Sequence, residues 1–353
     1  MAITKRQRWI PNPLKNLIIG FLIVFLTGCY SSPDLDEFPM DSTPAIESVV
    51  VLSTPEAVEI YLDPSLENEK INSDLSLTEL ENEKEDTNPI VEIENPSLFT
   101  PIFQFPISEE ANRSIEPSYR FGSTLFGERM PHDGIEILNS LGTPVLAAAD
   151  GTVFFSGDDR TKKWGRYTNL YGNFIIIEHK FGDFTYPIYT MYAHLSELIV
   201  TEGESVTENQ VIGAVGATGK AFTNHLHFEV RVGDVLLQNA RNPELYLPLI
   251  PQNGEEVGII IGSLLTKNGD FISGGSVVLQ RMIDGEPQPG SSIYLETYAK
   301  GIIGDDHWQE NFVVSNVQVG EYRISAFSNQ YFIEKFISVN EDDFTTIKLQ
   351  PEE

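Results

Sequence analysis

Two histidines that stand two residues apart, His225 and His227, lie in a run that alternates polar and apolar side chains. In an extended strand, side chains two residues apart share a face, so both imidazoles would point one way and Leu226 and Phe228 the other. Imidazole is a common zinc ligand and a common general acid or base. The run therefore predicts a strand that carries metal chemistry; the alternative is a strand with two surface histidines.

A second group of chemistry-bearing residues precedes this strand. His132 and Glu136 are four residues apart, and Pro131 and Gly134 disfavour an ordinary helix between them. In an extended run the two side chains share a face and can converge. With one histidine of the later pair they supply two imidazoles and a carboxylate, a common zinc set in hydrolases that leaves a fourth position for water. The other histidine of the pair, together with His194, would flank that water.

The segment that holds these residues is strand-like throughout. From about residue 101 to residue 250, short β-branched and aromatic runs are broken by Gly, Pro, Asn and Asp, and no long helical period occurs. We expect an antiparallel all-β domain over 98–250. Segments 142–153 and 204–213 echo each other weakly, like the halves of the hammerhead β unit of lipoyl carriers. No Lys stands at the turn that such a carrier would modify, so the echo indicates shared architecture only.

The C-terminal part is a second β-rich region. After a break rich in Pro, Asn, Gly and Glu at 248–256, roughly seven short strands are expected over 251–353, which predicts an immunoglobulin-like sandwich. Residues 311–326 resemble carboxypeptidase-regulatory or transthyretin-like domains, and that resemblance implies a structural or binding module. The only histidine of this region, His307, is expected to be a loop residue beside a packed Trp308 rather than a metal ligand.

The N-terminus has the features of an export signal. Four basic residues precede an apolar run at 17–26, which is too short for a membrane span of about 20 residues and suits a signal-peptide core. The string Leu26-Thr27-Gly28-Cys29 resembles the lipobox of bacterial lipoproteins. That resemblance implies removal of residues 1–28 and attachment of lipid to Cys29, the only cysteine in the chain. The alternative is an uncleaved anchor. Either arrangement places the remainder outside the cytoplasm, on a bacterial membrane.

The charge distribution excludes one class of partner. The net charge is −29, whereas nucleic-acid binding requires a basic surface. Residues 31–100 hold 18 acidic residues and two lysines, which is more than half of the net charge. High charge with low hydrophobicity predicts disorder. We interpret 29–97 as a disordered acidic tether.

Six motifs occur in a fixed order between residues 101 and 250. They are His132-x-Gly-x-Glu136, Gly142-Thr-Pro-Val145, Asp150-Gly-Thr-Val153, Tyr192-Ala-His-Leu-Ser196, Gly213-x-x-Gly-x-Thr-Gly219 and His225-Leu-His-Phe-Glu-Val-Arg231. Together they resemble the LytM/lysostaphin-type zinc metallopeptidases, which cut peptide cross-links in bacterial cell walls. The glycine-rich motif is not a nucleotide-binding loop, because it lacks the first Gly and the Ser/Thr that should follow Lys220.

The resemblance implies a role for each site residue. It implies zinc ligands at His132, Glu136 and His227, and it implies that His194 and His225 orient or deprotonate water and hydrogen-bond the developing oxyanion. The family has Asp where this chain has Glu136. Glutamate is a competent zinc ligand, although its extra methylene moves the carboxylate by roughly 1.5 Å. Asp133 should not substitute for it, because an adjacent strand residue points to the other face.

Several neighbouring residues have predicted roles outside the metal set. His179 is expected to form hydrogen bonds within the sheet, and Arg129 to position substrate or Glu136, or else to be a solvated charge. The polar loop 157–172 occupies the place where family loops wall the substrate groove, so Trp164 and Tyr167 are candidates for contact with cell-wall peptide.

The leading hypothesis is a lipid-anchored zinc endopeptidase that acts on peptidoglycan, with a C-terminal sandwich for positioning, for which an envelope protein or glycan is a candidate partner. One alternative is a catalytically silent LytM-like module that binds wall peptide or activates a partner amidase. A third is a surface adhesin in which both β domains bind carbohydrate or protein, and the intact site histidines argue against it.

Overall fold

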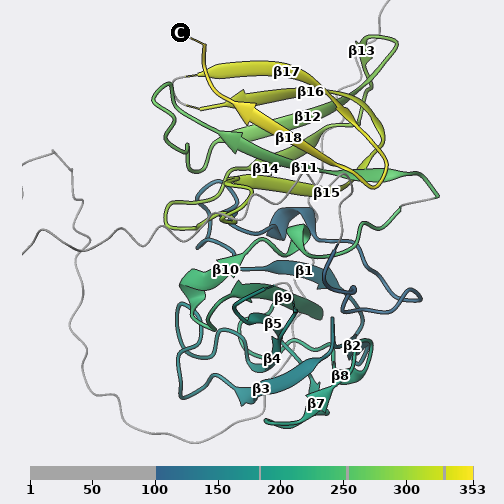
Figure 1. The fold of residues 1–353 in the computed structure, drawn as a ribbon, viewed down its shortest axis with the longest axis vertical. Helices are drawn as coiled ribbons and strands as arrows, with labels where there is room; N and C mark the ends of the chain where they lie inside the picture. Colours follow the sequence, from purple (N-terminus) through teal and green to yellow (C-terminus); the bar gives the residue numbers. More distant parts are fainter. Residues whose placement is uncertain (1–100, 183, 252–253, 329–330, 353) are drawn as a thin grey trace, which may run out of the picture. The chain divides into compact units, whose positions relative to one another are not determined.

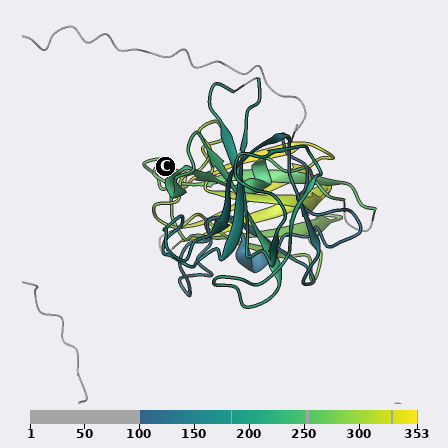
Figure 2. The same ribbon diagram turned by 90° about the horizontal axis from the view of Figure 1, so that it is seen from below.

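The computed structural model describes residues 101–353 except 183, 252–253, 329–330 and 353. The predicted signal peptide, Cys29 and the predicted tether lie outside the described residues. Within them the chain forms strands and three short 3-10 helices, which confirms the all-β prediction. No helix in this part of the chain is long and apolar enough to cross a membrane. Figures 1 and 2 show the earlier strands in blue to green and the later ones in green to yellow.

The first group of strands builds one large antiparallel sheet and one small one. The large sheet has the order β1-β9-β5-β4-β3-β7, with β10 paired to β9, and the small sheet has the order β2-β8-β6. The bounds are β1 Ile135–Leu138, β2 Pro144–Leu146, β3 Gly151–Asp158, β4 Asn173–His179, β5 Ile188–Ala193, β6 Glu197–Leu198, β7 Ser205–Val206, β8 Val211–Ala214, β9 His225–Val232 and β10 Ala240–Arg241. The 3-10 helices are η1 Pro117–Tyr119, η2 Leu237–Asn239 and η3 Pro243–Leu245.

The two segments that echo each other in sequence pair with each other in space. Strand β2 pairs with β8, and β3 pairs with β7, both antiparallel. The weak repeat therefore corresponds to two strand pairs, β3 with β7 inside the large sheet and β2 with β8 in the small one.

Strand β9 lies between β1 and β5 in the large sheet. Apolar and polar side chains alternate along it, so its two faces differ. Leu226, Phe228 and Val230 join the main apolar core, where Ile135, Ile137 and Tyr192 are also fully buried. The residues between them, His225, His227, Glu229 and Arg231, are buried as well. Because side chains alternate along a strand, these four polar groups share the opposite face. The apolar face of β9 thus packs the strand into the core, and the opposite face holds the polar residues of the candidate site.

The second group of strands forms two sheets around a shared core. One has the order β15-β11-β18 and the other β13-β12-β16-β17, with β14 paired to β12. Strands β11 and β18 are parallel, and the other pairs are antiparallel. Apolar residues of both sheets, including Ile260, Leu279 and Ile324, form one cluster. The bounds are β11 Val257–Leu264, β12 Ser276–Ile283, β13 Glu286–Pro287, β14 Ile293–Glu296, β15 Phe312–Gln318, β16 Gly320–Phe327, β17 Phe332–Val339 and β18 Phe344–Leu349.

Candidate metal centre

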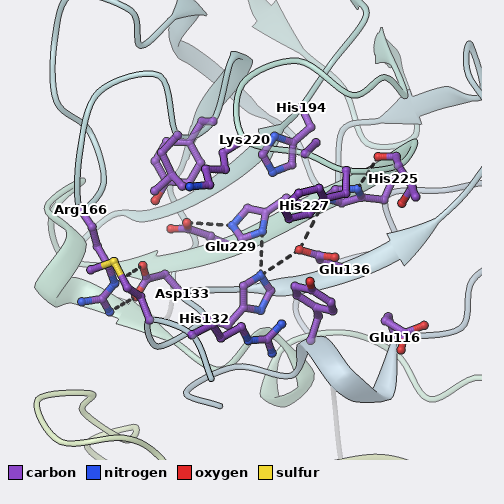
Figure 3. Close-up of a pocket in the computed structure, with 18 of the residues that line it drawn as sticks. Glu116, His132, Asp133, Glu136, Arg166, His194, Lys220, His225, His227 and Glu229 are labelled. Carbon is purple, nitrogen blue, oxygen red and sulfur yellow. Dashed lines mark hydrogen bonds and ion pairs between the residues drawn. The ribbon is translucent and has the colours of Figure 1, made fainter. Parts of the chain in front are cut away.

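The register between β1 and β9 places the predicted ligands together. In this antiparallel pair Glu136 lies directly opposite His227, and Leu138 lies opposite His225. His132 belongs to the extended segment just before β1 and turns its ring toward the same face (Figure 3). Residues almost a hundred positions apart therefore meet because one edge strand pairs with the histidine strand.

The distances among the three predicted ligands fit one zinc ion. His132 Nε2 lies 3.1 Å from His227 Nδ1 and 3.3 Å from Glu136 Oε1. Two ligand atoms held at 2.0–2.1 Å from one zinc in tetrahedral geometry lie roughly 3.3 Å apart. The donor atoms of all three residues fall within 4.8 Å of one another. The residues present therefore fit a metal ion with two nitrogen ligands and one oxygen ligand.

The carboxylate of Glu136 is held in its ionised form. Burial raises its pKa, but the bond from His132 and the neighbouring histidines outweigh burial and lower the pKa to about 2. An ionised carboxylate is the form that binds a metal. The longer side chain of Glu136 also brings Oε1 within 3.5 Å of His225 Nε2. Oε1 of Glu136 thus lies close both to His132, another predicted ligand, and to His225, a predicted catalytic histidine.

A carboxylate behind His227 fixes which nitrogen faces the metal. His227 Nε2 lies 3.0 Å from Glu229 Oε1, so Nε2 carries the hydrogen and Nδ1 is free as a ligand. Glu229 also accepts a bond from Arg231 Nε at 2.8 Å, and Arg231 Nη2 donates to the hydroxyl of Tyr171. Burial raises the pKa of Glu229, but Arg231 and His227 lower it to about 2. The carboxylate is therefore charged and can orient the imidazole.

The two remaining histidines are oriented by backbone carbonyls. His194 Nδ1 lies 2.8 Å from the carbonyl oxygen of Thr218, and His225 Nδ1 lies 2.9 Å from that of Thr223. Each Nδ1 therefore carries the hydrogen, and each Nε2 keeps a lone pair. His225 Nε2 is buried without a hydrogen-bond partner. An orphaned buried nitrogen beside the metal donors is a position for water or for a substrate oxygen.

Both of these histidines are neutral at pH 7. Burial and the neighbouring histidines lower the pKa of His194 to about 3, and burial lowers the pKa of His225. The two rings are 4.7 Å apart between centroids, and His194 lies 5.6 Å from the ring of His227. His194 has a φ of 63°, a left-handed backbone conformation that a residue with a Cβ seldom adopts. Strained residues of this kind are often found at functional sites.

All five predicted site residues line a single pocket of about 610 Å³ (Figure 3). Other side chains that line it include Tyr119, Arg129, Met130, Tyr167, Lys220 and Phe222. Phe222 is 88% exposed, and Lys220 Nζ lies 5.7 Å from the ring centroid of Tyr167. The pocket therefore joins the metal donors to apolar and cationic side chains that a peptide could contact.

Asp133 takes no part in the donor set identified among the described residues, although it precedes β1 and lines the same pocket, so its partner rather than a strand face keeps it apart. Its two carboxylate oxygens accept bonds from Arg166 Nε and Nη2, at 3.0 and 2.5 Å. Burial and Glu229 raise the pKa of Asp133 to about 6. This ion pair attaches the loop between β3 and β4 to the residue next to His132. Nothing in the sequence indicates Arg166, whereas Glu229 follows His227 by two residues, so strand alternation could have found it.

The other predicted neighbours have mixed outcomes. His179 is buried and lies 2.8 Å from both the Asp150 carbonyl oxygen and Thr190 Oγ1, a hydrogen-bonding role within the sheet, as predicted. Trp164 packs against Phe155 and Phe174 away from the metal pocket, while Tyr167 lines it. The hydrophobic environment of β3 and β4 therefore holds the indole, and of these two candidates only Tyr167 lines the pocket.

Two further predictions concern the side chains of Arg129 and His307. Arg129 lines the pocket and places its guanidinium 3.7 Å from the ring centroid of Tyr119, so it is not merely a solvated charge. His307 is exposed and contacts Trp308, with ring centroids 4.7 Å apart. His307 takes no part in the metal donor group identified among the described residues.

The fold and the donor set define a metallopeptidase-type domain, and comparison with known proteins identifies its family. Residues 130–242 match the model of peptidase family M23. This part of the chain is a peptidase family M23 domain.

Curated relatives share this part of the chain. The DD-carboxypeptidase/endopeptidase Mpg of Neisseria meningitidis is 38% identical over 135 residues, which is 36% of this chain and 28% of that protein. The peptidoglycan DD-endopeptidase ShyC of Vibrio cholerae is 35% identical over 119 residues, or 34% of this chain and 24% of that protein. The chain thus spans about a quarter of the length of these relatives.

Solved structures show the same likeness. A zinc-containing peptidase from Vibrio cholerae is 29% identical, with 38% of this chain and 37% of that chain covered and a TM-score of 0.29. The catalytic domain of lysostaphin from Staphylococcus simulans is 30% identical, with 32% and 76% covered and a TM-score of 0.27.

Proposed function

We propose that this protein is a zinc endopeptidase that hydrolyses peptide cross-links of bacterial peptidoglycan outside the cytoplasm. The observation that carries the proposal is the convergence of His132, Glu136 and His227 with the two neutral histidines His194 and His225 in one pocket. Relatives named as peptidoglycan DD-endopeptidases support the substrate.

The donor set fits a zinc ion, and the ion would supply the chemistry that zinc supplies in other hydrolases. Zinc held by the three side chains would polarise the scissile carbonyl and lower the pKa of a coordinated water to about 7. Glu229 keeps Nδ1 of His227 directed at the donor set. The ionised Glu136 completes it and offsets part of the positive charge.

The catalytic histidines have a defined order of proton transfers. Because the Nδ1 hydrogens of His194 and His225 are bonded to carbonyl oxygens, each neutral ring offers only the lone pair of Nε2. Such a ring first accepts the proton of the attacking water and only then has an Nε2 hydrogen to donate. The protonated ring can hydrogen-bond the oxyanion or deliver its proton to the leaving amine.

The test uses the full chain and purified peptidoglycan. One zinc per chain and conversion of cross-linked muropeptide dimers to monomers, detected by mass spectrometry, are expected for the wild type, and loss of turnover is expected for His194→Ala and His225→Ala. Release of intact peptides from glycan strands would indicate an amidase instead. A zinc-loaded protein that binds wall without new amine ends would support the silent LytM-like module and overturn the peptidase.

The location of the protein is part of the same proposal. Lipid on Cys29, outside the described residues, would anchor the chain to a bacterial membrane, and the sandwich of β11 to β18 would hold an envelope protein or glycan. Incorporation of labelled palmitate, lost together with membrane association in Cys29→Ala, is the expected result. A wild-type chain that is found unlabelled in the soluble fraction would contradict the anchor.

A further inference from the structure

One carboxylate of the C-terminal strands holds a segment that leads to the metal site. Glu296, at the end of β14, accepts hydrogen bonds from the backbone N–H groups of Thr124 and Phe126 at 2.9 and 3.0 Å. It also accepts bonds from the hydroxyls of Ser123 and Thr124, at 3.1 and 2.5 Å. Four bonds to one ionisable side chain, over a sequence separation of about 170 residues, make a specific attachment.

The attached segment has an unfavourable backbone conformation. Leu125 and Phe126 are consecutive residues with φ of 53° and 55°, and both have a Cβ, which makes this conformation unfavourable. The two residues are 42% and 58% exposed, so apolar burial does little to fix them. The bonds to Glu296 hold this conformation together with two bonds inside the segment, from the Leu125 N–H to Ser123 Oγ and from the Gly127 N–H to Thr124 Oγ1.

The same segment is bonded directly to the first predicted metal ligand. The N–H of His132 donates to the carbonyl of Ser123 at 3.0 Å, and the N–H of Gly122 donates to the carbonyl of His132 at 2.8 Å. The N–H of Arg129 donates to the carbonyl of Thr124 at 3.0 Å. The backbone of His132 is thus bonded to Ser123, which Glu296 holds, and to the neighbouring Gly122.

Neighbouring contacts keep the base of the segment against the sandwich. The N–H of Ala299 donates to the carbonyl of Gly122 at 2.9 Å, and the ring of Tyr298 packs on Phe121 with centroids 5.1 Å apart. Gly122 has a φ of 76°, and a Cβ there would lie 2.6 Å from the Tyr298 ring. Only glycine allows this approach.

The segment ends in the wall of the metal pocket. Arg129 and Met130 line the pocket together with Tyr119, on which the guanidinium of Arg129 lies. A shift of residues 123–127 would therefore displace this wall as well as the backbone of His132. Catalytic geometry is sensitive to displacements of about 1 Å.

We propose that Glu296 is a positioning residue for the peptidase site: by fixing residues 122–132 it couples the C-terminal sandwich to one wall of the substrate pocket. This inference rests on the proposed function for its substrate, a cross-linked peptide. The sandwich then acts on peptide binding itself, beyond any contact that it makes with the envelope.

The test compares variants on both sides of the contact. Glu296→Ala removes all four bonds, Glu296→Gln keeps one acceptor oxygen, and Thr124→Val removes the hydroxyl from the opposite side. Glu286→Ala, an exposed glutamate in β13, is the matched control. The measurements are kcat and KM on a soluble muropeptide dimer, zinc content, and amide hydrogen exchange of residues 122–132.

The expected result is a rise in KM of about tenfold in Glu296→Ala. A tenfold change corresponds to the free energy of about one charge-assisted hydrogen bond. Zinc content, measured with zinc in excess, should stay near wild type, and kcat should fall because the backbone of His132 moves with the segment. Exchange should accelerate within 122–132, and Glu296→Gln should recover most of both kinetic constants. The double variant with Thr124→Val should raise KM by less than the product of the two single effects, because the Thr124 hydroxyl bonds Glu296 as well as the Gly127 N–H. A KM equal to that of the control, or additive effects in the double variant, would overturn the proposal.

Failure of the proposed function gives a different pattern. If the wild type cleaves no cross-link, the peptidase proposal is wrong and hydrogen exchange decides the positioning role. Faster exchange confined to residues 122–132 in Glu296→Ala would uphold the attachment of this segment by Glu296. Unchanged exchange there would overturn it.

Discussion

His227 donates its Nε2 hydrogen to Glu229, 3.0 Å away, and so presents Nδ1 to His132 and Glu136. The carboxylate that selects this nitrogen is fully buried and is itself bonded to Arg231. A charged network behind the ligand, rather than the ligand alone, therefore sets the geometry of the donor group.

Replacement of Glu229 should weaken zinc binding without removing a ligand. Glu229→Gln keeps the side-chain volume but loses the charge, and loss of such an outer partner typically costs 10-fold to 100-fold in metal affinity. Competition with a chromophoric chelator measures this change, and Glu202→Gln, at an exposed position, is the control. Equal affinity in the two variants would show that Glu229 does not act through His227.

Replacement of Glu136 tests the ligand that departs from the family pattern. Glu136→Ala should lose zinc and activity, because two imidazoles alone remain. Glu136→Asp should retain zinc and lose the 3.5 Å contact with His225. Metal analysis and turnover after removal and return of zinc check both. Zinc that is absent from the wild type but present in Glu136→Asp would mean that the glutamate disables the site.

His179 should make the protein less stable as pH falls. Burial lowers its folded pKa to about 4 from 6.5, so the unfolded chain binds its proton first. Stability is then lost as pH decreases from 6.5 toward 4, by roughly 3 kcal/mol in total. Urea unfolding of chelator-treated protein at pH 7.5 and pH 5 measures the loss. His179→Gln should lose less than the wild type between these pH values, whereas the exposed His307→Gln should match it; identical slopes in all three would refute the assignment.

Glu310 should make the protein less stable as pH rises, which is the opposite of the effect of His179. It is buried, it accepts a bond from the Tyr298 hydroxyl at 3.0 Å, and burial raises its pKa to about 7 from 4.5. The folded chain holds this proton longer than the unfolded chain, so stability is lost as pH rises from 4.5 to 7, by roughly 3 kcal/mol.

The two titrations overlap, so single variants are needed to separate them. Glu310→Gln should remove the loss on the alkaline side of this window, and the exposed Glu341→Gln should keep it. Unfolding measured at pH 5 and pH 7.5 tests the difference. A wild-type slope in Glu310→Gln would show that another group causes the change.

Local sequence rules were sufficient for much of the site. The period of two in residues 225–231 places His225, His227, Glu229 and Arg231 on one face, and the four-residue spacing brings His132 to Glu136. The all-β class followed from short β-branched runs without a helical period. These features depend on backbone geometry over a few residues, which the sequence encodes directly.

The remaining relationships depend on contacts between distant segments. The pairing of β1 with β9 puts Glu136 opposite His227, Arg166 reaches Asp133 from a loop, and Glu296 reaches Thr124 from the C-terminal strands. No local period connects such residues, because their approach is decided by which apolar faces pack together and by which buried charges find partners. The sequence by itself determined the chemistry and the class of the fold. Only the tertiary structure decided which carboxylates orient the site, since that choice is made by packing.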